Sequence, residues 1–280
     1  MQAKDLISSS LRLRALPKVY YQLQQLLDSE QASSATIAHC LRNDPALSAH
    51  VLRIANSSLY NLSSKIDTIS RAVTVIGHNA VHNQVLASSA VGMFNKRKMP
   101  YFNIREYWEH SLRSAILAQK LAEQCQVLHS ESYFVGGLLH DIGTMVIAMK
   151  LPELARTLYM HFPDEIKPQH EIEFETLGFT HADVGGELLA SWALSAHLVE
   201  AVRHHEQPEG APESPFSAAI IQIASAYVQC GFHDTERLEH MIDPFSWRIS
   251  GLHHEQLPRL LLETEGVFAE TFSLFFTRAA

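Results

Sequence analysis

The chain has 280 residues, of which 46% are hydrophobic and 19% are charged, a composition that supports a buried core and excludes wholesale disorder. Its 22 lysines and arginines against 30 aspartates and glutamates give a formal net charge of −8. This charge opposes binding to nucleic acid, which remains the weakest hypothesis for the N-terminal helices. The one short basic run, Lys96-Arg97-Lys98, is interpreted as a solvated connection.

Cysteine usage and hydropathy indicate the compartment. The three cysteines, Cys40, Cys125 and Cys230, are odd in number, widely spaced and form no CxxC pair. This pattern excludes a disulfide framework and a cysteine zinc site, and it fits a reducing compartment. The N-terminus has no apolar signal core, and we find no uninterrupted apolar run that approaches the roughly 18 residues of a membrane span. We therefore expect a cytoplasmic protein without a membrane segment.

Helical periodicity begins near the N-terminus. Apolar side chains at positions 16, 20, 23 and 27 recur at spacings that place them on one face of a helix. Asp44 followed by Pro45 predicts the start of a second helix, because aspartate caps helix N-termini and proline suits the first helical position. Gly77 predicts the end of one helix and the start of another.

Further caps predict the helices of the middle of the chain. Asn103, with an acidic residue three positions later, predicts a long helix that ends near Cys125. Ser130 is expected to cap the segment that runs to His140-Asp141, and Gly143 is expected to mark its end.

The later segments also contain residues that typically cap or interrupt helices. Thr180 with Asp183 resembles a capping box, and Ser195 is expected to cap a helix that ends at residues 203–206. The stretch 207–215 holds three prolines and a glycine, which predicts a loop. A last helical unit is expected after residues 243–244.

Strand signals are poor, since neither sustained alternation of apolar and polar residues nor a tight hairpin turn occurs. We therefore predict an all-α protein of about a dozen helices in an irregular multi-helix bundle. The expected divisions are an N-terminal helical subdomain at 1–98, a histidine-bearing helical core at 99–235 and a C-terminal helical extension at 236–280.

Histidine is the residue type that stands out, with 17 in the chain. Neutral imidazole is a good ligand for zinc, iron, manganese or nickel, and a carboxylate can bridge two metals. Adjacent His140 and Asp141 point about 100° apart on a helix, so both reach one interior point only near a helix end. His204 and His205 repeat this geometry before Pro208.

Each imidazole ligand would need an acceptor to fix its tautomer, and Glu109, Asp183 and Glu206 are the candidates that lie nearby in the sequence. The alternative is that a histidine in a helical protein binds no metal and is a surface residue or a hydrogen-bonded core residue. We apply that interpretation to the histidines outside the segments around positions 110, 140, 181 and 204–205.

The order of these segments resembles a known pattern. His110, His140-Asp141, His181 and His204-His205 resemble the metal-binding set of the HD phosphohydrolase superfamily, in the branch that includes the HD-GYP phosphodiesterases. The stretches at 43–57 (NDPALSAHVLRIANS) and 69–77 (ISRAVTVIG) are similar to the HDOD domain family. The two likenesses together cover roughly residues 15–230.

The resemblance implies an all-helical HDOD fold with an HD-like core, found in bacterial signalling and regulatory proteins. In the related phosphodiesterases the matching histidines and aspartate hold two metals, and metal-bound water attacks the phosphorus. It implies here a first metal on His110, His140 and Asp141 and a second on His181, His204 and His205. Asp141 is then the expected bridging group, and the catalytic residue if the chain is an enzyme.

Three departures from the family pattern bear on activity. Ser225 stands where the superfamily has its last aspartate ligand, which removes one negative charge from the site. Thr144 replaces the lysine that often follows the His-Asp-Ile-Gly segment. The residues after Glu206, 207–210, are not the GYP loop, so specificity for cyclic di-GMP is not supported. Together with Arg113, one turn after His110, Thr144 and Ser225 are the candidates to contact a phosphate or another ligand.

Two functions remain open at this point. The first is a signal-transduction or regulatory module with a degenerate metal site, which binds a signalling protein or a small phosphorylated ligand. The second is a metal-dependent phosphohydrolase or phosphodiesterase that acts on a nucleotide or phosphoester through metal-bound water. Either would use one or two divalent transition metals (iron, manganese, zinc or nickel), unless the site has lost metal and survives as a polar core.

Overall fold

The computed structural model describes residues 1–8, 13, 15–95, 99–160, 168–231 and 235–276. Throughout this described part the regular structure is helical, with no β-strand, so the predicted all-α class is confirmed. The basic run at 96–98 lies outside the described residues.

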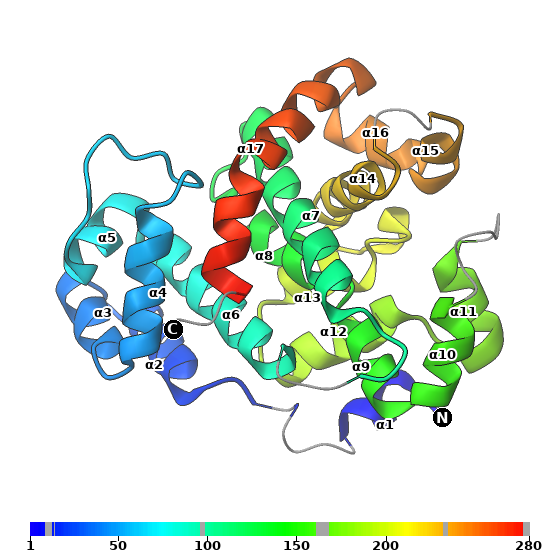
Figure 1. The fold of residues 1–280 in the computed structure, drawn as a ribbon, viewed down its shortest axis with the longest axis horizontal. Helices are drawn as coiled ribbons and strands as arrows, with labels where there is room; N and C mark the ends of the chain where they lie inside the picture. The colour runs from blue at the N-terminus through cyan, green and yellow to red at the C-terminus, as the bar shows by residue number, and fades with distance from the viewer. Residues whose placement is uncertain (9–12, 14, 96–98, 161–167, 232–234, 277–280) are drawn as a thin grey trace. The chain divides into compact units, whose positions relative to one another are not determined.

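The chain divides into two compact units, which we call the N-terminal unit and the site unit. The N-terminal unit comprises residues 16–96 and 263–280, and the site unit comprises residues 1–15 and 97–262 (Figure 1). The domain limits expected from the sequence stay predictions, and these units differ from them at both chain ends. Residues 1–15 join the site unit, where the indole of Trp192 donates a hydrogen bond to the carbonyl of Leu13 (2.6 Å).

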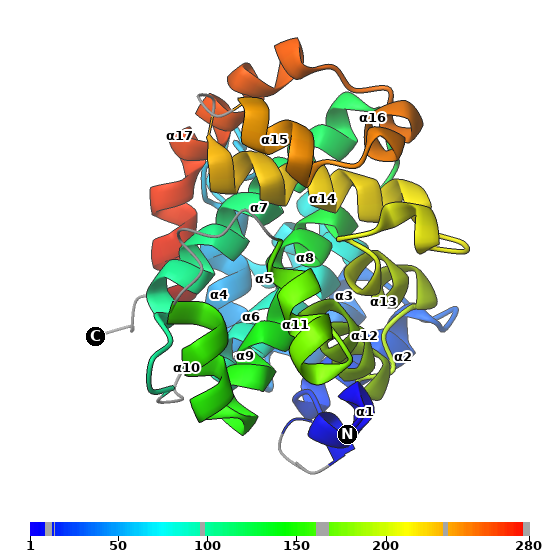
Figure 2. The same cartoon turned by 90° about the vertical axis from the view of Figure 1, so that its right-hand side faces the viewer.

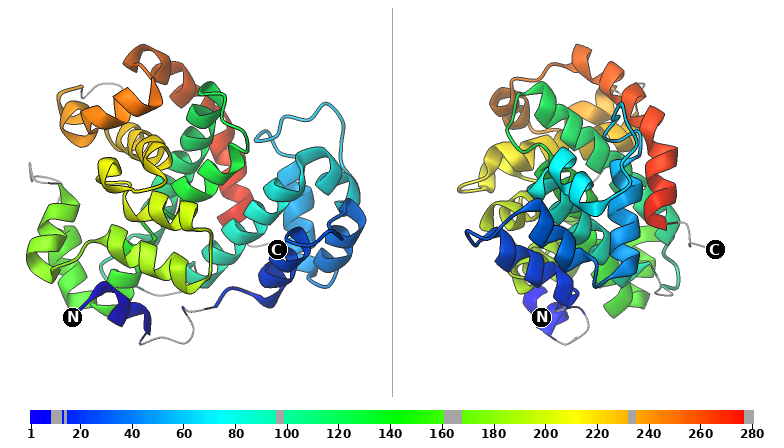
Figure 3. Two further views of the ribbon diagram at one scale, coloured as in Figure 1. Left: turned by 180° about the vertical axis from the view of Figure 1, so that it is seen from behind. Right: turned by 90° about the vertical axis from the view of Figure 1, so that its left-hand side faces the viewer.

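In the described residues, the N-terminal unit consists of helices α2 to α6 and the later part of α17. Within it, α3 packs on α5, and both α2 and α4 pack on α6, as the left-hand panel of Figure 3 shows for the blue and cyan helices. The helices are α2 (Lys18–Leu27), α3 (Ser34–Leu41), α4 (Pro45–Ala55), α5 (Ile69–Ile76), α6 (His78–Phe94) and the part of α17 (Leu257–Phe276) that follows residue 262.

Local signals in this unit act as predicted. The carboxylate of Asp44 accepts hydrogen bonds from the backbone of Ala46 and Leu47 at the start of α4. Gly77 separates α5 from α6 with a φ of 93°, a left-handed conformation that glycine adopts without strain. The last turn of α17 packs against the same unit, where the ring of Phe275 meets that of the buried His50 edge to face at 4.7 Å.

The site unit holds the remaining helices, among which α14 lies alongside both α7 and α8 (Figure 2). They are α1 (Ala3–Ser8), α7 (Ile104–Gln124), α8 (Glu131–Leu139), α9 (Ile142–Lys150), α10 (Pro152–Met160), α11 (Gln169–Leu177), α12 (His181–Ser191), α13 (Ala196–Arg203), α14 (Pro215–Cys230), α15 (Thr235–Met241) and α16 (Pro244–Ser250), with two 3-10 turns at Pro208–Gly210 and His254–Gln256.

Most of the predicted caps in the site unit are present. Asn103, Ser195 and Asp243 each accept a backbone hydrogen bond at the start of a helix, and Thr180 forms a reciprocal capping box with Asp183. The predicted cap at Ser130 is wrong, because its hydroxyl donates to Glu123 instead of accepting from the first turn of α8.

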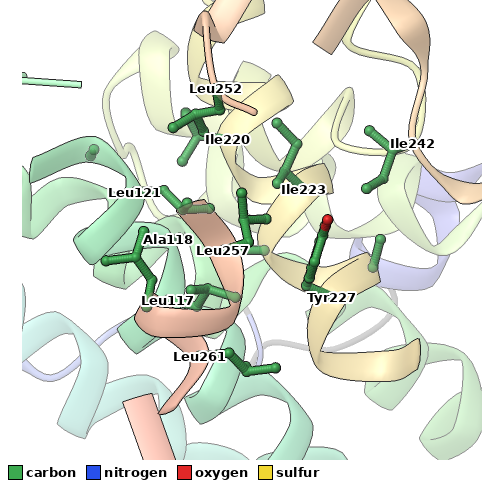
Figure 4. Packing of buried hydrophobic residues seen from close by; sticks show 14 of the residues in the cluster. Leu117, Ala118, Leu121, Ile220, Ile223, Tyr227, Ile242, Leu252, Leu257 and Leu261 are labelled. Carbon is green, nitrogen blue, oxygen red and sulfur yellow. The ribbon is translucent and has the colours of Figure 1, made fainter. Parts of the chain in front are cut away.

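One apolar cluster holds α7, α14 and the start of α17 together (Figure 4). Leu121 of α7, Ile223 of α14 and Leu257 of α17 are among its fully buried members. Each such side chain contributes roughly 1.5–3 kcal/mol when removed from water. The packing fixes the register of α7 against α14, and therefore the positions of His110 and Ser225 on these two helices.

Two glycines allow helices to approach closely beside the site. A β-carbon at Gly137 in α8 would lie 2.7 Å from the Cα of Ala115 in α7. A β-carbon at Gly143 in α9 would overlap the carbonyl oxygen of His181 at the start of α12. Gly143 thus does not end a helix, as the sequence suggested; it lies inside α9 and lets α9 pack against α12.

The expectation that no apolar stretch reaches membrane length was wrong. Among the described residues one stretch, Glu131–Lys150, is long and apolar enough to cross a membrane. However, 83% of its most apolar window is buried inside the protein. It consists of α8 and α9 with His140-Asp141 between them, and it is a buried part of the site unit.

Candidate metal centre

The predicted ligands come from separate helices of the site unit. His110 lies in α7, His140 and Asp141 lie between α8 and α9, and His181 is the first residue of α12. His205 follows the C-terminus of α13. Among the described residues two groups could hold a metal ion, His110–His140–Asp141 and Asp141–His181–His205, with ligand atoms within 4.8 Å of one another in each group.

A helix break brings His140 and Asp141 to the same point. α8 ends at Leu139 and α9 begins at Ile142, so the two residues form the junction. His140 has helical dihedral angles, whereas Asp141 departs from them with φ −95° and ψ 11°. The prediction that adjacent side chains converge only near a helix end is confirmed, although the end precedes Gly143.

Asp141 directs its two carboxylate oxygens at two different pairs of imidazoles. Oδ2 lies 3.2 Å from Nε2 of His140 and 3.9 Å from Nε2 of His110. Oδ1 lies 3.1 Å from Nε2 of His181 and 3.5 Å from Nε2 of His205. This arrangement is the one that a carboxylate needs to bridge two cations.

We call the cluster of side chains around Asp141 the pocket. Its first side, the Ser225 half, comprises His110, His140, Ser225 and Oδ2 of Asp141. The hydroxyl of Ser225 lies 3.2 Å from Nε2 of His110 and 3.1 Å from Nε2 of His140. Ser225 of α14 therefore lies between the two imidazoles.

We call the second side the Glu206 half; it comprises His181, His205, Glu206 and Oδ1 of Asp141. Oε1 of Glu206 lies 3.5 Å from Nε2 of His181 and 3.6 Å from Nε2 of His205. The two imidazole nitrogens are 3.4 Å apart. This half thus contains a second carboxylate, whereas the Ser225 half shares only Asp141.

Hydrogen bonds to Nδ1 orient three of the imidazoles. Nδ1 of His140 lies 2.8 Å from the carbonyl oxygen of Gly137, and Nδ1 of His205 lies 2.7 Å from that of Val202. A carbonyl oxygen only accepts, so both Nδ1 atoms carry the proton. In the neutral ring, Nε2 then has a lone pair that faces the pocket, which is the tautomer that binds a metal through Nε2.

His181 is oriented by a buried carboxylate. Glu173 of α11 is inaccessible to solvent and accepts from Nδ1 of His181 at 2.7 Å and from its backbone N–H at 2.6 Å. The hydroxyl of Tyr159 and the amide of Gln169 donate to the other oxygen of the same carboxylate. Carboxylate–histidine pairs of this kind fix the ring and raise its basicity as a ligand.

The charges of the pocket shift several pKa values. Burial opposes the charged form of Asp141 and of Glu206, but the surrounding histidines outweigh it and hold both pKa values well below the usual range. Burial also opposes protonation of His205, yet hydrogen bonds to Asp141 and Glu206 raise its pKa to about 9. In the same way Glu173 and Asp141 raise the pKa of His181 well above normal.

His110, in the other half, behaves in the opposite way. Burial, followed by the adjacent His140, lowers the pKa of His110 to about 4 against a smaller opposing effect of Asp141. The Glu206 half therefore stabilises positive charge and the Ser225 half does not.

The pocket is reachable from solvent at its acidic side chains. The side chains of His140, His181 and His205 are at most 3% exposed, whereas Asp141 is 24% and Glu206 31% exposed. His110 is 25% exposed. A small ion or ligand can therefore reach Asp141 without unfolding the bundle.

Some of the predicted residues lie elsewhere. His204 is outside both groups; its ring lies next to Gly210 of the following turn, so the structure does not bring it to the predicted second metal. The guanidinium of Arg113 lies 3.9 Å from the carboxylate of Glu109. Thr144 is buried in α9, with its hydroxyl next to the phenol of Tyr159.

The expected orienting carboxylates were largely wrong. Asp183 accepts from Thr180 in the capping box, and Glu109 pairs with Arg105. Glu173, which does orient His181, was missed, because it lies eight residues away on another helix and no local pattern connects the two. Glu206 was suggested only as an orienting group, whereas it faces the pocket beside Asp141.

The profile of the HDOD domain family matches residues 13–208, and the chain belongs to this family. The fold agrees with this assignment. An HDOD domain protein of unknown function from Geobacter sulfurreducens superposes with a TM-score of 0.78 and 23% identity, over 98% of this chain and 97% of that one.

Two further relatives are similar over most of the chain. A crystal structure from Shewanella amazonensis SB2B named "Putative phosphohydrolase" has 26% identity and a TM-score of 0.74, over 93% of this chain and 94% of that one. An uncharacterized protein of Treponema pallidum is 24% identical over 88% of this chain and 45% of its own length. The chain spans less than half the length of the curated relatives that it matches.

Proposed function

We propose that this HDOD domain is a regulatory module whose pocket around Asp141 binds one or two divalent transition metals, and through them a partner protein or a small phosphorylated ligand. The observation that carries the proposal is the position of Asp141, whose two oxygens face two separate pairs of imidazole nitrogens.

The donor set fits such metals. Imidazole nitrogens with carboxylate oxygens are the ligands that zinc, manganese, iron and nickel accept in proteins. The Nδ1 hydrogen bonds of His140, His181 and His205 already select the tautomer that presents Nε2 to the pocket. The ligands come from elements fixed by a packed core, so the site is built before an ion arrives.

A bound divalent cation would supply Lewis acidity toward a phosphoryl or carboxylate oxygen of a ligand. The chain's own residues would do the rest. Asp141 holds the two halves at a fixed separation, and the buried imidazoles exclude water from the inner side of the pocket. The partly exposed edge at His110 and Glu206 leaves one side open to a ligand.

The test is metal binding by the purified full chain. After chelation and dialysis, titration with Mn²⁺ or Co²⁺ followed by calorimetry is expected to show binding in wild type and its loss in Asp141→Asn. Retention of full affinity by Asp141→Asn, or no binding by wild type, would overturn the proposal. A screen for partners and for thermal stabilisation by phosphorylated compounds then identifies the ligand.

A second candidate function is phosphoester hydrolysis at the same pocket. Two observations favour it: the bridging position of Asp141, and the likeness to the Shewanella protein that bears the phosphohydrolase name. The assay is hydrolysis of bis-p-nitrophenyl phosphate and of cyclic nucleotides with added Mn²⁺. Turnover that is absent, or that is unchanged in the double variant His140→Ala, Asp141→Ala, would reject the enzyme.

A further inference from the structure

We propose that Glu206 is itself a metal ligand, and that the Glu206 half binds the first ion, ahead of the half that contains His110 and Ser225. This inference rests on the proposed function, because it assigns the order of metal binding within the same pocket. The sequence implied the reverse, a first ion on His110, His140 and Asp141 and His204 as a ligand of the second.

Most of the distances within the Glu206 half match the separations between ligands of one metal ion. For metal–ligand bonds of 2.0–2.2 Å, the ligand atoms at the corners of a tetrahedron lie roughly 3.3–3.6 Å apart. Five of the six corresponding separations in this half are 3.1, 3.4, 3.5, 3.5 and 3.6 Å. In the Ser225 half one of the ligand separations, from His110 to Asp141, widens to 3.9 Å.

The hydrogen-bonding capacity of the four groups points the same way. Nδ1 of His181 donates to Glu173 and Nδ1 of His205 donates to Val202, so both neutral rings present a lone pair. The carboxylate oxygens of Asp141 and Glu206 also only accept. A divalent cation at the point where the four groups converge would be bound by two nitrogen lone pairs and two carboxylate oxygens.

In the Ser225 half a hydroxyl links the two imidazoles, and Nε2 of His140 also faces Oδ2 of Asp141 at 3.2 Å. Because Nδ1 of His140 carries the proton, its Nε2 accepts from the hydroxyl of Ser225, and that hydroxyl can accept in turn from Nε2–H of His110. This chain connects His140, Ser225 and His110 without an ion, and it leaves Asp141 as the one carboxylate of this half. A cation that enters this half must break the chain and gains no second carboxylate.

Glu206 therefore takes over the role of the carboxylate that Ser225 lacks, but on the opposite side of Asp141. Glu206 is 31% exposed, and its other oxygen lies 3.2 Å from Nδ1 of His170, which positions the carboxylate without occupying Oε1. The chemical class of the ligand is a divalent first-row transition metal bound by two imidazoles and two carboxylates.

The experiment is titration of the metal-free full chain with Co²⁺, read by the visible absorption of the ion and by calorimetry. The variants are Glu206→Gln, His205→Ala and His110→Ala, with Glu209→Gln, an exposed glutamate of the following turn, as the matched control. We expect Glu206→Gln to weaken the first equivalent by roughly 10–100-fold and to change its spectrum. Glu209→Gln should keep both, and His110→Ala should weaken the second equivalent more than the first.

The outcomes separate this inference from the proposed function. If wild type binds no Co²⁺, both this inference and the proposed function are overturned. If wild type binds Co²⁺ and Asp141→Asn abolishes binding, while Glu206→Gln keeps the affinity and spectrum of the first equivalent, the assignment of Glu206 is overturned and the metal centre stands. Loss of the first equivalent in His110→Ala with retention in His205→Ala overturns the order of binding, and needs no Glu206 variant to fold.

Discussion

The two halves of the pocket differ in a single kind of group, and that difference decides what each half can do. In the Ser225 half, a hydroxyl that both donates and accepts lies between His110 and His140. In the Glu206 half, a carboxylate that only accepts lies beside His181 and His205. The first half therefore has one carboxylate and the second has two, since both share Asp141.

The largest expected effect comes from removing the group that the halves share. Asp141→Asn should weaken metal binding in both halves by about 100-fold or more, because an amide carries no negative charge and has only one oxygen to bind a metal. Calorimetric titration with Mn²⁺ measures this. Glu153→Gln, 78% exposed on α10, is the control that should bind as wild type does. Equal losses in the two variants would contradict a specific role for Asp141.

A glycine at the edge of the Glu206 half should matter almost as much. Gly143→Ala places a methyl group against the carbonyl oxygen of His181, and we expect a loss of about 1–3 kcal/mol in the free energy of unfolding. Because α12 must shift, metal affinity should fall as well.

Gly92→Ala is the matched control, since a β-carbon there meets nothing within 4 Å and α6 is otherwise regular. That variant should gain roughly 0.5–1 kcal/mol. Urea unfolding measures both changes. A neutral or stabilising Gly143→Ala would show that α9 and α12 are not held as closely as described.

Glu173, the buried carboxylate that orients His181, should affect metal binding in the Glu206 half alone. Glu173→Gln should lower affinity for the first equivalent of metal by about 10-fold or more, since an amide is a weaker acceptor for Nδ1 of His181. Glu175→Gln, exposed on the same helix, should leave it unchanged. If Glu173→Gln affected the second equivalent and spared the first, the order assigned to the halves would be wrong.

Adding a carboxylate to the Ser225 half should make the two halves more alike. Ser225→Asp places a carboxylate between His110 and His140, so the second equivalent of metal should bind about 10-fold more tightly. The first equivalent should change little. The control is Ser225→Ala, which removes the hydroxyl without adding charge. A buried serine elsewhere, such as Ser217 with its hydrogen bond to His197, would not be a matched control. Tightening in Ser225→Ala as large as that in Ser225→Asp would contradict the electrostatic account.

A histidine outside the pocket gives the smallest effect and the clearest contrast. His50 is buried in the N-terminal unit, where burial and then Arg53 lower its pKa to about 4. Between pH 6.5 and 4, His50 is therefore protonated in the unfolded chain but neutral in the folded chain. The free energy of unfolding should fall as the pH falls through that window.

Between pH 7 and pH 5.5 this cost should be about 1 kcal/mol, and it should vanish in His50→Leu. Urea unfolding of both proteins at the two pH values measures it. Equal acid sensitivity in wild type and variant would show that His50 is free to protonate in the folded state.

The sequence predicts most of the local structure, because caps and breaks are short-range. Asp44, Gly77 and the Thr180–Asp183 box act where the sequence places them. The convergence of His110, His140, Asp141, His181 and His205 also follows the family order. Long-range packing is harder to foresee: α17 continues from the site unit into the N-terminal unit, which no local pattern indicates.

Within the site, the errors come from geometry at helix ends. His204 and His205 are chemically equivalent in the sequence, but α13 ends at Arg203 and the backbone that follows directs only His205 inward. Gly143 looks like a helix terminator, and its actual role depends on an approach to α12 that is 38 positions away in the chain at His181. Glu173 orients His181 from another helix for the same reason.

Anomalous scattering from crystals of the full chain grown with a limiting amount of Mn²⁺ tests the central claim most directly. We predict a peak enclosed by Oδ1 of Asp141, Oε1 of Glu206 and the Nε2 atoms of His181 and His205, stronger than any peak beside Ser225. A peak confined to the side of His110 and His140, or no peak at all, would contradict the account.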